Sequence, residues 1–218
     1  MLSAFPGYDF ADGVALGDIN SDGKQDLIVT SQQTDTINIK LNNGDGTFPA
    51  SPSYGPIPAG NSPRSIVTDD FNRDGRTDIA VVAFTGRLLS VFLQTSPGVF
   101  AHAAGSPYTI DTLARPTTLV LSDLNNDRLN DAVISTENGG FSVMYGRRDG
   151  SFGGLTQFGV TGSPFTVATG DFNNDNAPDV FVVPSNNTGV KLFANSFSGS
   201  NCTFVANSSP FDFDGDGR

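Results

Sequence analysis

The sequence is poor in the residues on which most catalytic and disulfide-stabilised frameworks depend. It has one cysteine (Cys202), one histidine (His102), one glutamate (Glu137) and no tryptophan. A lone cysteine excludes an intrachain disulfide framework. The histidine has no serine or cysteine nucleophile motif beside it, and neither Gly-x-Ser-x-Gly nor His-Glu-x-x-His occurs. We therefore do not expect an enzyme.

Further absences narrow the partners and the location. Lysine and arginine total 12 and form no basic stripe, so a nucleic-acid partner is not expected. No apolar run approaches the ~20 residues of a membrane span. The start of the chain, residues 1–7, is too short and too uncharged for a signal peptide. The chain is either not exported or a mature or truncated piece of an exported protein.

Acidic residues, in contrast, are abundant, and nearly all of them are aspartate. Of the 23 acidic residues, 22 are aspartate, which suits turns and short-reach metal loops, whereas glutamate suits helices. Twelve of these acids lie in four short loops, and four bound Ca²⁺ ions would change the formal net charge from −11 to −3. The acidity is better explained as metal-ligand charge than as a surface for basic partners.

Those loops repeat one pattern, Asp-x-Asn-x-Asp-x-x-x-Asp. It begins at Asp18, Asp70, Asp123 and Asp171, in steps of 52, 53 and 48 residues, and a fifth copy at Asp212 lacks its last position. A run of β-formers follows each complete loop, then an alternating strand, a glycine turn and a phenylalanine. The repeat units are 11–60, 61–113, 114–162 and 163–210, with a truncated repeat at 211–218.

Each unit contains the elements of a propeller blade. A first strand precedes the loop, and three more follow it, so that four antiparallel strands occupy about 50 residues. No stretch has a sustained 3.6-residue apolar period, which predicts almost no helix. We expect one all-β domain over residues 1–218, a β-propeller with about four blades.

The loop has the ligand spacing of a calcium site. Ca²⁺ takes 6–8 oxygens at roughly 2.3–2.6 Å, and positions 1, 3, 5 and 9 supply side-chain oxygens while position 7 offers a backbone carbonyl. An EF-hand is excluded because its glutamate at position 12 is replaced by valine or isoleucine in a strand. The predicted ligands are Asp18, Asn20, Asp22 and Asp26; Asp70, Asn72, Asp74 and Asp78; Asp123, Asn125, Asp127 and Asp131; Asp171, Asn173, Asp175 and Asp179; and the carbonyls of Lys24, Arg76, Leu129 and Ala177.

Position 6 of the loop must turn sharply, which favours positive φ and hence glycine. Gly23 and Gly75 comply, Asn176 tolerates this conformation, and Arg128 makes the third loop the costliest. Asp, Asn and Gly are also ordinary turn residues. An acid at position 9 in all four copies favours metal binding, since a hairpin turn needs no acid there.

At these residues the chain resembles the FG-GAP/VCBS repeat family, which includes the propeller heads of integrin α subunits. The resemblance implies four-stranded blades with up to four Ca²⁺ in the loops between first and second strands. It also implies a usual ring of seven blades, of which this chain would be a segment; a closed four-bladed ring is the alternative. An open segment would expose apolar blade faces and favour self-association. Members are mostly extracellular or periplasmic, which we expect here.

The leading functional hypothesis is a non-catalytic, calcium-stabilised adhesion or recognition module for extracellular protein or carbohydrate ligands. A lectin is the narrower alternative, because aromatic side chains on turns stack on sugar rings; inter-blade packing is their other explanation. The remaining alternative is an accessory or catalytic domain of a polysaccharide-active enzyme. The aromatic residues concerned are Tyr54, Phe84, Tyr108 and Phe158.

Overall fold

The computed structural model describes residues 11–110, 114–160, 162–185, 189–198 and 201–206, and strands are the regular elements found there. None of these residues is helical, so none forms a helix that could span a membrane. The chain folds as two compact units, Met1–Thr112 with Arg148–Ser151, and Leu113–Arg147 with Phe152–Arg218. Each unit holds two sheets.

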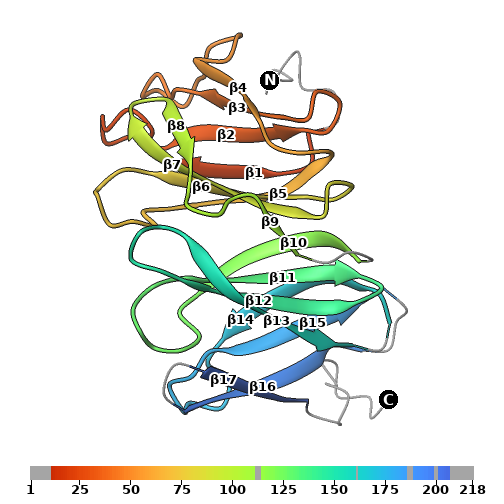
Figure 1. Cartoon of the computed structure of the whole chain (residues 1–218). Helices are drawn as coiled ribbons and strands as arrows, with labels where there is room; N and C mark the ends of the chain where they lie inside the picture. Colours follow the sequence, from red (N-terminus) through yellow and green to blue (C-terminus); the bar gives the residue numbers. More distant parts are fainter. Residues whose placement is uncertain (1–10, 111–113, 161, 186–188, 199–200, 207–218) are drawn as a thin grey trace. The chain divides into compact units, whose positions relative to one another are not determined.

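The first unit contains two antiparallel sheets, which we call blades one and two (Figure 1). Blade one has the order β1-β2-β3-β4 and blade two the order β5-β6-β7-β8, with β9 on β7. Their strands are β1 (Val14–Gly17), β2 (Asp26–Ser31), β3 (Thr36–Lys40), β4 (Tyr54–Pro58), β5 (Pro63–Asp69), β6 (Asp78–Ala83), β7 (Leu88–Ser96), β8 (Val99–His102) and β9 (Tyr108–Thr109).

The second unit contains blades three and four, again with strands in sequence order. Blade three consists of β10 (Arg115–Ser122), β11 (Asp131–Glu137), β12 (Gly140–Gly146) and β13 (Phe152–Gly159). Blade four consists of β14 (Pro164–Gly170), β15 (Asp179–Pro184), β16 (Lys191–Ser198) and β17 (Asn201–Ala206).

The all-β prediction and the four-stranded blades are confirmed. Every predicted first, second and third strand overlaps an observed one, and each acidic loop joins the first two strands of its blade. The strand β9 was not predicted, because two residues carry no periodicity. The single domain over residues 1–218 stays a prediction, and the truncated repeat at 211–218 lies outside the described residues.

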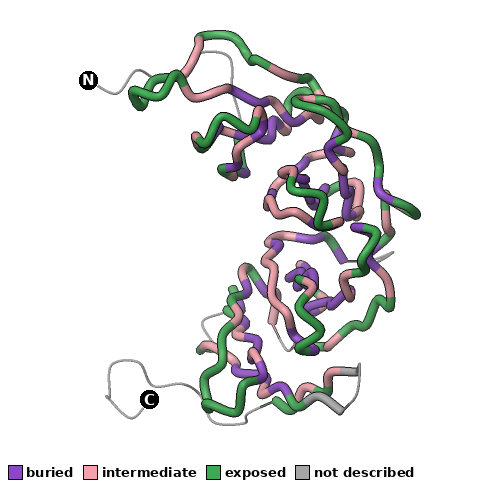
Figure 2. Tube along the Cα trace, turned by 90° about the vertical axis from the view of Figure 1, so that its left-hand side faces the viewer, coloured by how far each residue is buried: buried purple, intermediate pink, exposed green. Residues whose placement is uncertain are grey.

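Each unit has its own apolar core between its two blades (Figure 2 colours the trace by burial). In the first, Ile19, Ile28 and Ile39 of blade one pack with Ile66 and Phe92 of blade two. In the second, side chains of blade three pack with those of blade four: Leu124, Val133, Phe141, Val143, Val167, Val180, Val182 and Phe193. The second strands are the most buried, and all of β6 is buried. Their unbroken β-branched runs match strands covered on both faces.

Candidate metal-binding loops

The acidic loops begin where the first strand of a blade ends and close where the second begins. Position 9 pairs with the last residue of the first strand, as in Gly17 opposite Asp26 and Ser122 opposite Asp131. The loop is therefore the turn of a β-hairpin, and the hairpin register fixes its two ends.

Position 6 has positive φ in all four loops, as predicted. The values are 82° at Gly23, 83° at Gly75, 71° at Arg128 and 67° at Asn176. Position 4 is left-handed too, with φ of 60–61° at Ser21, Arg73, Asn126 and Asn174. Asparagine in two of these places was the sequence signal for this second turn, since it tolerates the left-handed region better than most residues.

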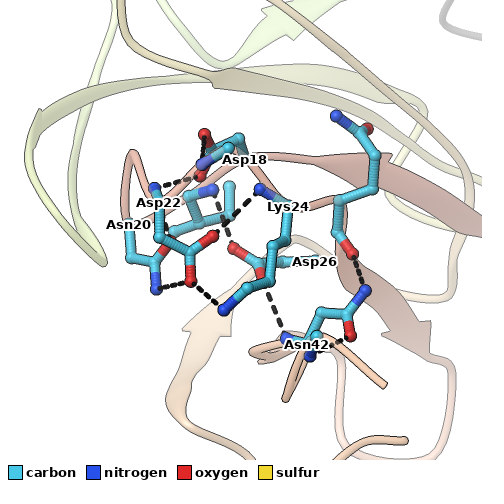
Figure 3. A network of polar contacts seen from close by, with 10 residues as sticks. Asp18, Asn20, Asp22, Lys24, Asp26 and Asn42 are labelled. Carbon is cyan, nitrogen blue, oxygen red and sulfur yellow. Dashed lines mark hydrogen bonds and ion pairs between the residues drawn. The ribbon is translucent and has the colours of Figure 1, made fainter. Parts of the chain in front are cut away.

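The first loop is held together by its own side chains (Figure 3). Asp18 accepts the backbone N–H of Asp22 at 3.1 Å and that of Gly23 at 2.8 Å. The side-chain oxygen of Asn20 accepts the N–H of Asp22, and Asp22 accepts the N–H of Lys24. The aspartates at positions 1 and 5 thus accept hydrogen bonds from the backbone N–H groups of positions 5, 6 and 7.

The other three loops repeat these bonds atom for atom. Position 1 accepts the N–H groups of positions 5 and 6, and the side chain at position 3 both accepts from the N–H of position 5 and donates to its carboxylate. The acceptors at position 1 are Asp70, Asp123 and Asp171, with N···O distances between 2.7 and 3.1 Å. The side-chain amides at position 3 belong to Asn72, Asn125 and Asn173. Arg128 at position 6 therefore does not alter the loop.

The aspartate at position 9 is fully buried and has a second role. One carboxylate oxygen of Asp26 accepts the N–H of Ile19 in the loop, and the other accepts the N–H of Asn42 beyond β3, both at 2.9 Å. Asp78, Asp131 and Asp179 make the same pair of bonds in their blades. The argument that a hairpin needs no acid at position 9 was wrong, because this carboxylate ties the loop to the end of the third strand.

Two of the position 9 carboxyl groups have a raised pKa. Burial raises the pKa of Asp78 to about 6, and the carboxylate of Asp74 adds to the rise. Burial likewise raises the pKa of Asp131 to about 7, with contributions from Asp127 and Asp123, although backbone N–H donors oppose the shift. A cation in the loop would favour the ionised carboxylates.

Position 7 separates the loops into two kinds. Lys24 forms an ion pair with Asp22 at 3.1 Å, and Arg76 forms one with Asp74 at 2.6 Å. The hydrogen bond from Lys24 lowers the pKa of Asp22. Leu129 and Ala177, at position 7 of the third and fourth loops, have no charge to offer. The side chain at position 7 of these two loops therefore supplies no positive charge.

The donor set fits calcium, although the described residues contain no group of three or more acid, histidine or cysteine side chains arranged as a metal site. The donors are carboxylate and amide oxygens, the hard ligands that Ca²⁺ prefers. Each loop brings positions 1, 3, 5 and 9 onto one short turn, as drawn for the first loop in Figure 3. The sixteen predicted ligand side chains therefore lie in four separate loops, where they accept hydrogen bonds from N–H donors.

The remaining candidates belong to the packing. His102 stacks on Phe92 with ring centroids 4.5 Å apart, and its Nδ1 lies 3.2 Å from Ser106 Oγ, which accepts the N–H of Val91. Among the aromatic residues, Tyr54 packs on the first core and Phe158 on the second. The ring of Phe84 lies under the Arg64 guanidinium, 3.6 Å from ring centroid to Cζ, and Tyr108 donates to the carbonyl of Ala104. These contacts favour the packing explanation for the aromatics.

Known structures share the fold. BBS1N, crystallised in complex with ARL6DN and soaked with lead, is similar with a TM-score of 0.55 and 12% identity over 91% of this chain and 56% of that one. The periplasmic gluconolactonase PpgL of Pseudomonas aeruginosa is similar with a TM-score of 0.61 and 16% identity over 92% of this chain and 54% of that one. The chain thus spans about half the length of these structures, and identities this low show the fold alone.

In sequence, no protein with a curated description is similar enough to count as a match. A family model described as an FG-GAP-like repeat matches residues 18–81, 70–134 and 123–182. Each match begins at the first aspartate of an acidic loop and ends in the second strand of the following blade. Together they cover most of the chain, which belongs to the FG-GAP-like repeat family.

Proposed function

We propose that this chain is a non-catalytic, calcium-stabilised β-propeller module that recognises a protein or glycan ligand outside the cytoplasm. The observation that carries the proposal is the fourfold repetition of one all-oxygen loop with the same bonds in each copy. In this role the ion does no chemistry; it neutralises carboxylates and holds each hairpin turn in place.

Positions 1, 3, 5 and 9 would hold the ion, together with the carbonyl at position 7. The test is calorimetric titration of chelator-treated protein with CaCl₂. Binding of several ions is expected, and Asp127→Asn together with Asp175→Asn should remove sites in the third and fourth loops. Asp45→Asn, in an exposed turn outside the loops, is the matched control. The absence of heat in every form of the protein would contradict calcium binding.

The ligand-binding surface is proposed by elimination. The side chains of the acidic loops hydrogen-bond within the fold, those of the cores are buried, and the single histidine contacts Phe92 and Ser106. Ligands would therefore meet surfaces away from the acidic loops. BBS1N, which has this fold, was crystallised in complex with ARL6DN. A glycan array probed in calcium separates the two ligand classes, since a lectin requires sugar hits and a protein-recognition module does not.

The second candidate is enzymatic, because the periplasmic gluconolactonase PpgL shares the fold. The direct assay is hydrolysis of gluconolactone by the purified chain, with and without calcium. We expect no turnover above the uncatalysed rate. Turnover that follows the protein through purification would replace the recognition proposal.

A further inference from the structure

The side chain of an arginine at the start of β5 is held by a ring and a carboxylate. Arg64 lies between Pro63 and Ser65, where the pairing of β5 with β6 shifts register as at a β-bulge. Its guanidinium lies over the ring of Phe84, with Cζ 3.6 Å from the ring centroid. Its Nε lies 3.4 Å from Oδ2 of Asp12, which makes an ion pair between blades two and one. A bulge commonly re-aims one side chain of a strand, and here that side chain is a cation.

The guanidinium of Arg64 makes no hydrogen bond within the described part of the chain. Its Nε is buried there without an acceptor, since the contact with Asp12 is an ion pair but not a hydrogen bond. The two Nη atoms also have no acceptor among the described residues, but they are not buried, and the side chain is 34% exposed. A guanidinium carries five N–H donors in a planar fork that matches a carboxylate. The Nη edge of the fork is therefore open to an acceptor from outside the chain.

Phe84 sets the plane of this fork. It directly follows β6, and its backbone N–H donates to the carbonyl of Ser62 at 2.8 Å, which fixes the start of the ring's side chain. An arginine stacked on an aromatic ring keeps its charge and its planar donors. Because the guanidinium is oriented before a ligand arrives, less side-chain entropy is lost when the ligand binds.

Blade one supplies polar groups beside the guanidinium. Asp12 and Gln32 flank the β1–β2 hairpin at the end away from its acidic loop, where the N–H of Thr30 donates to the carbonyl of Gly13. Gln32 donates its side-chain amide to the Asp12 carboxylate. Strands β1 and β5 lie side by side (Figure 1). A Cβ on Gly13 would lie 2.0 Å from the carbonyl oxygen of Arg64, so a glycine is needed for this close approach.

The second unit does not repeat this arrangement, although it repeats the acidic loops. The register shifts in its first strands leave Thr117 and Phe165 where blade two has Arg64. Six residues after position 9, where blade two has Phe84, it has Glu137 and Ser185. A contact that a blade required for folding would recur in every blade, as the acidic loops do. The stacked arginine is therefore an addition to the blade scaffold and not a part of it.

We propose that Arg64 binds the carboxylate of an acidic sugar, a uronic acid unit of a glycan, at the end of blades one and two that lies away from their acidic loops. The Nη edge would donate to the carboxylate of the sugar, and Asp12 and Gln32 would bind its hydroxyl groups. This inference names a ligand class for the recognition function proposed above and rests on that function.

Asp12 favours an acidic sugar over an acidic peptide. An ionised carboxylate only accepts hydrogen bonds, so it can pair with the hydroxyl donors that surround the carboxylate of a uronic acid. A run of aspartate or glutamate side chains would bring further carboxylates against it and no hydroxyl donors. The net charge of −11 adds to the repulsion of such a peptide.

The test is calorimetric titration of the whole chain with tetragalacturonic acid and with its methyl ester, in the same CaCl₂ buffer. The acid should bind, and the ester, which keeps the ring hydroxyls but lacks the charge, should bind roughly tenfold more weakly or worse. Arg64→Gln should weaken binding of the acid by roughly tenfold or more. Arg64→Lys keeps the charge but not the fork and should weaken it less. Arg148→Gln, at an exposed turn, is the matched control and should bind as the wild type does.

Circular dichroism and the melting temperature check that the variants fold. If Arg64→Gln does not fold, Arg64→Lys and the ester carry the comparison. Equal binding of acid and ester, full binding by Arg64→Gln, or an equal loss in Arg148→Gln overturns the proposal. So does a wild-type chain that binds neither tetragalacturonic nor tetramannuronic acid.

Titration with hexaglutamate separates the two sources of carboxylate. Hexaglutamate that binds as tightly as the sugar acid, and loses this binding in Arg64→Gln, overturns the assignment to a sugar in favour of an acidic peptide. The failure of this site is distinguishable from the failure of the recognition function. Neutral sugars that bind on the glycan array would retain that function and exclude an acidic-sugar site at Arg64.

Discussion

The side-chain amide of Gln94 donates a buried hydrogen bond to the backbone carbonyl of Ile19, which lies 75 residues earlier in the chain and in the other blade of the unit. The acceptor is a loop residue, so the bond ties the acidic loop of blade one to the third strand of blade two. Asn195 and Leu124 repeat the relationship in the second unit. The acidic loops of blades one and three are thus held by hydrogen bonds within their own hairpins and by a hydrogen bond from the next blade.

Replacing Gln94 by leucine should lower the free energy of unfolding by about 1–3 kcal/mol, because the carbonyl of Ile19 would be left buried without a donor. The measurement is urea unfolding followed by circular dichroism. Gln33→Leu, at an exposed turn position of the same unit, is the control and should change stability by about 0.5 kcal/mol or less. Equal effects of the two substitutions would mean that the hydrogen bond contributes nothing.

Asparagine at position 9 should be more damaging than its similar size suggests. Both oxygens of Asp26 accept backbone N–H groups, and an asparagine amide would set its own N–H donors against one of them. We expect Asp26→Asn to cost about 2–4 kcal/mol of unfolding free energy. Asp45→Asn serves as the control, since the Asp45 oxygen that binds Thr47 can be replaced by the amide oxygen. If Asp26→Asn left the free energy of unfolding unchanged, the N–H of Ile19 or of Asn42 would have to find another acceptor.

Substitutions at position 6 test whether the loop requires a positive φ there. A Cβ added at Gly75 would meet nothing within 4 Å, and its φ is 83°, so alanine there is penalised by conformation alone. Gly75→Ala should cost about 1–2 kcal/mol, while Gly75→Asn should cost less. Gly159 also has open space but no positive φ, so Gly159→Ala should cause no loss. If both alanines were tolerated, the turn would not require this conformation.

The repeat and its spacing predicted most of the fold. A fixed period of about 50 residues with the same order of strands leaves few architectures, and the acidic loops marked the first hairpin of each blade. Position 6 was predicted for a physical reason, and all four loops, Arg128 included, have the expected positive φ.

The sequence could not predict what depends on contacts across the blade. The hydrogen bond from the N–H of Asn42 to the carboxylate of Asp26 joins residues 16 apart, whose proximity follows from the strand register. Val14 is 64% exposed and Ile66 is 5% exposed, although both are β-branched residues in first strands, so the sequence could not predict this difference in burial. No sequence motif marks the hydrogen bonds of Gln94 and Asn195, because the donor is glutamine in one blade and asparagine in the other.

Cys202 should react slowly despite being only partly buried. Burial raises the pKa of its thiol, and its Sγ lies 3.2 Å from the carbonyl of Leu124. A raised thiol pKa leaves less thiolate at neutral pH, and the thiolate is the nucleophile. Alkylation by iodoacetamide should be about tenfold slower in the folded chain than in urea-unfolded chain, with its pH midpoint shifted upward. Equal rates with equal midpoints would contradict the buried environment.

The central claim is that each acidic loop binds Ca²⁺ and that the bound ion stabilises the fold. Its most direct test is to compare the melting temperature in excess CaCl₂ with that in excess EDTA. One site filled at a hundredfold excess over its dissociation constant adds about 2.7 kcal/mol, and each 1 kcal/mol raises the melting temperature of a chain this size by roughly 2–4 °C. Calcium should therefore raise it by at least about 5 °C for one site, and MgCl₂ by less. A melting temperature that is the same in calcium and in EDTA would contradict the claim, because the loops would then be held by their own hydrogen bonds alone.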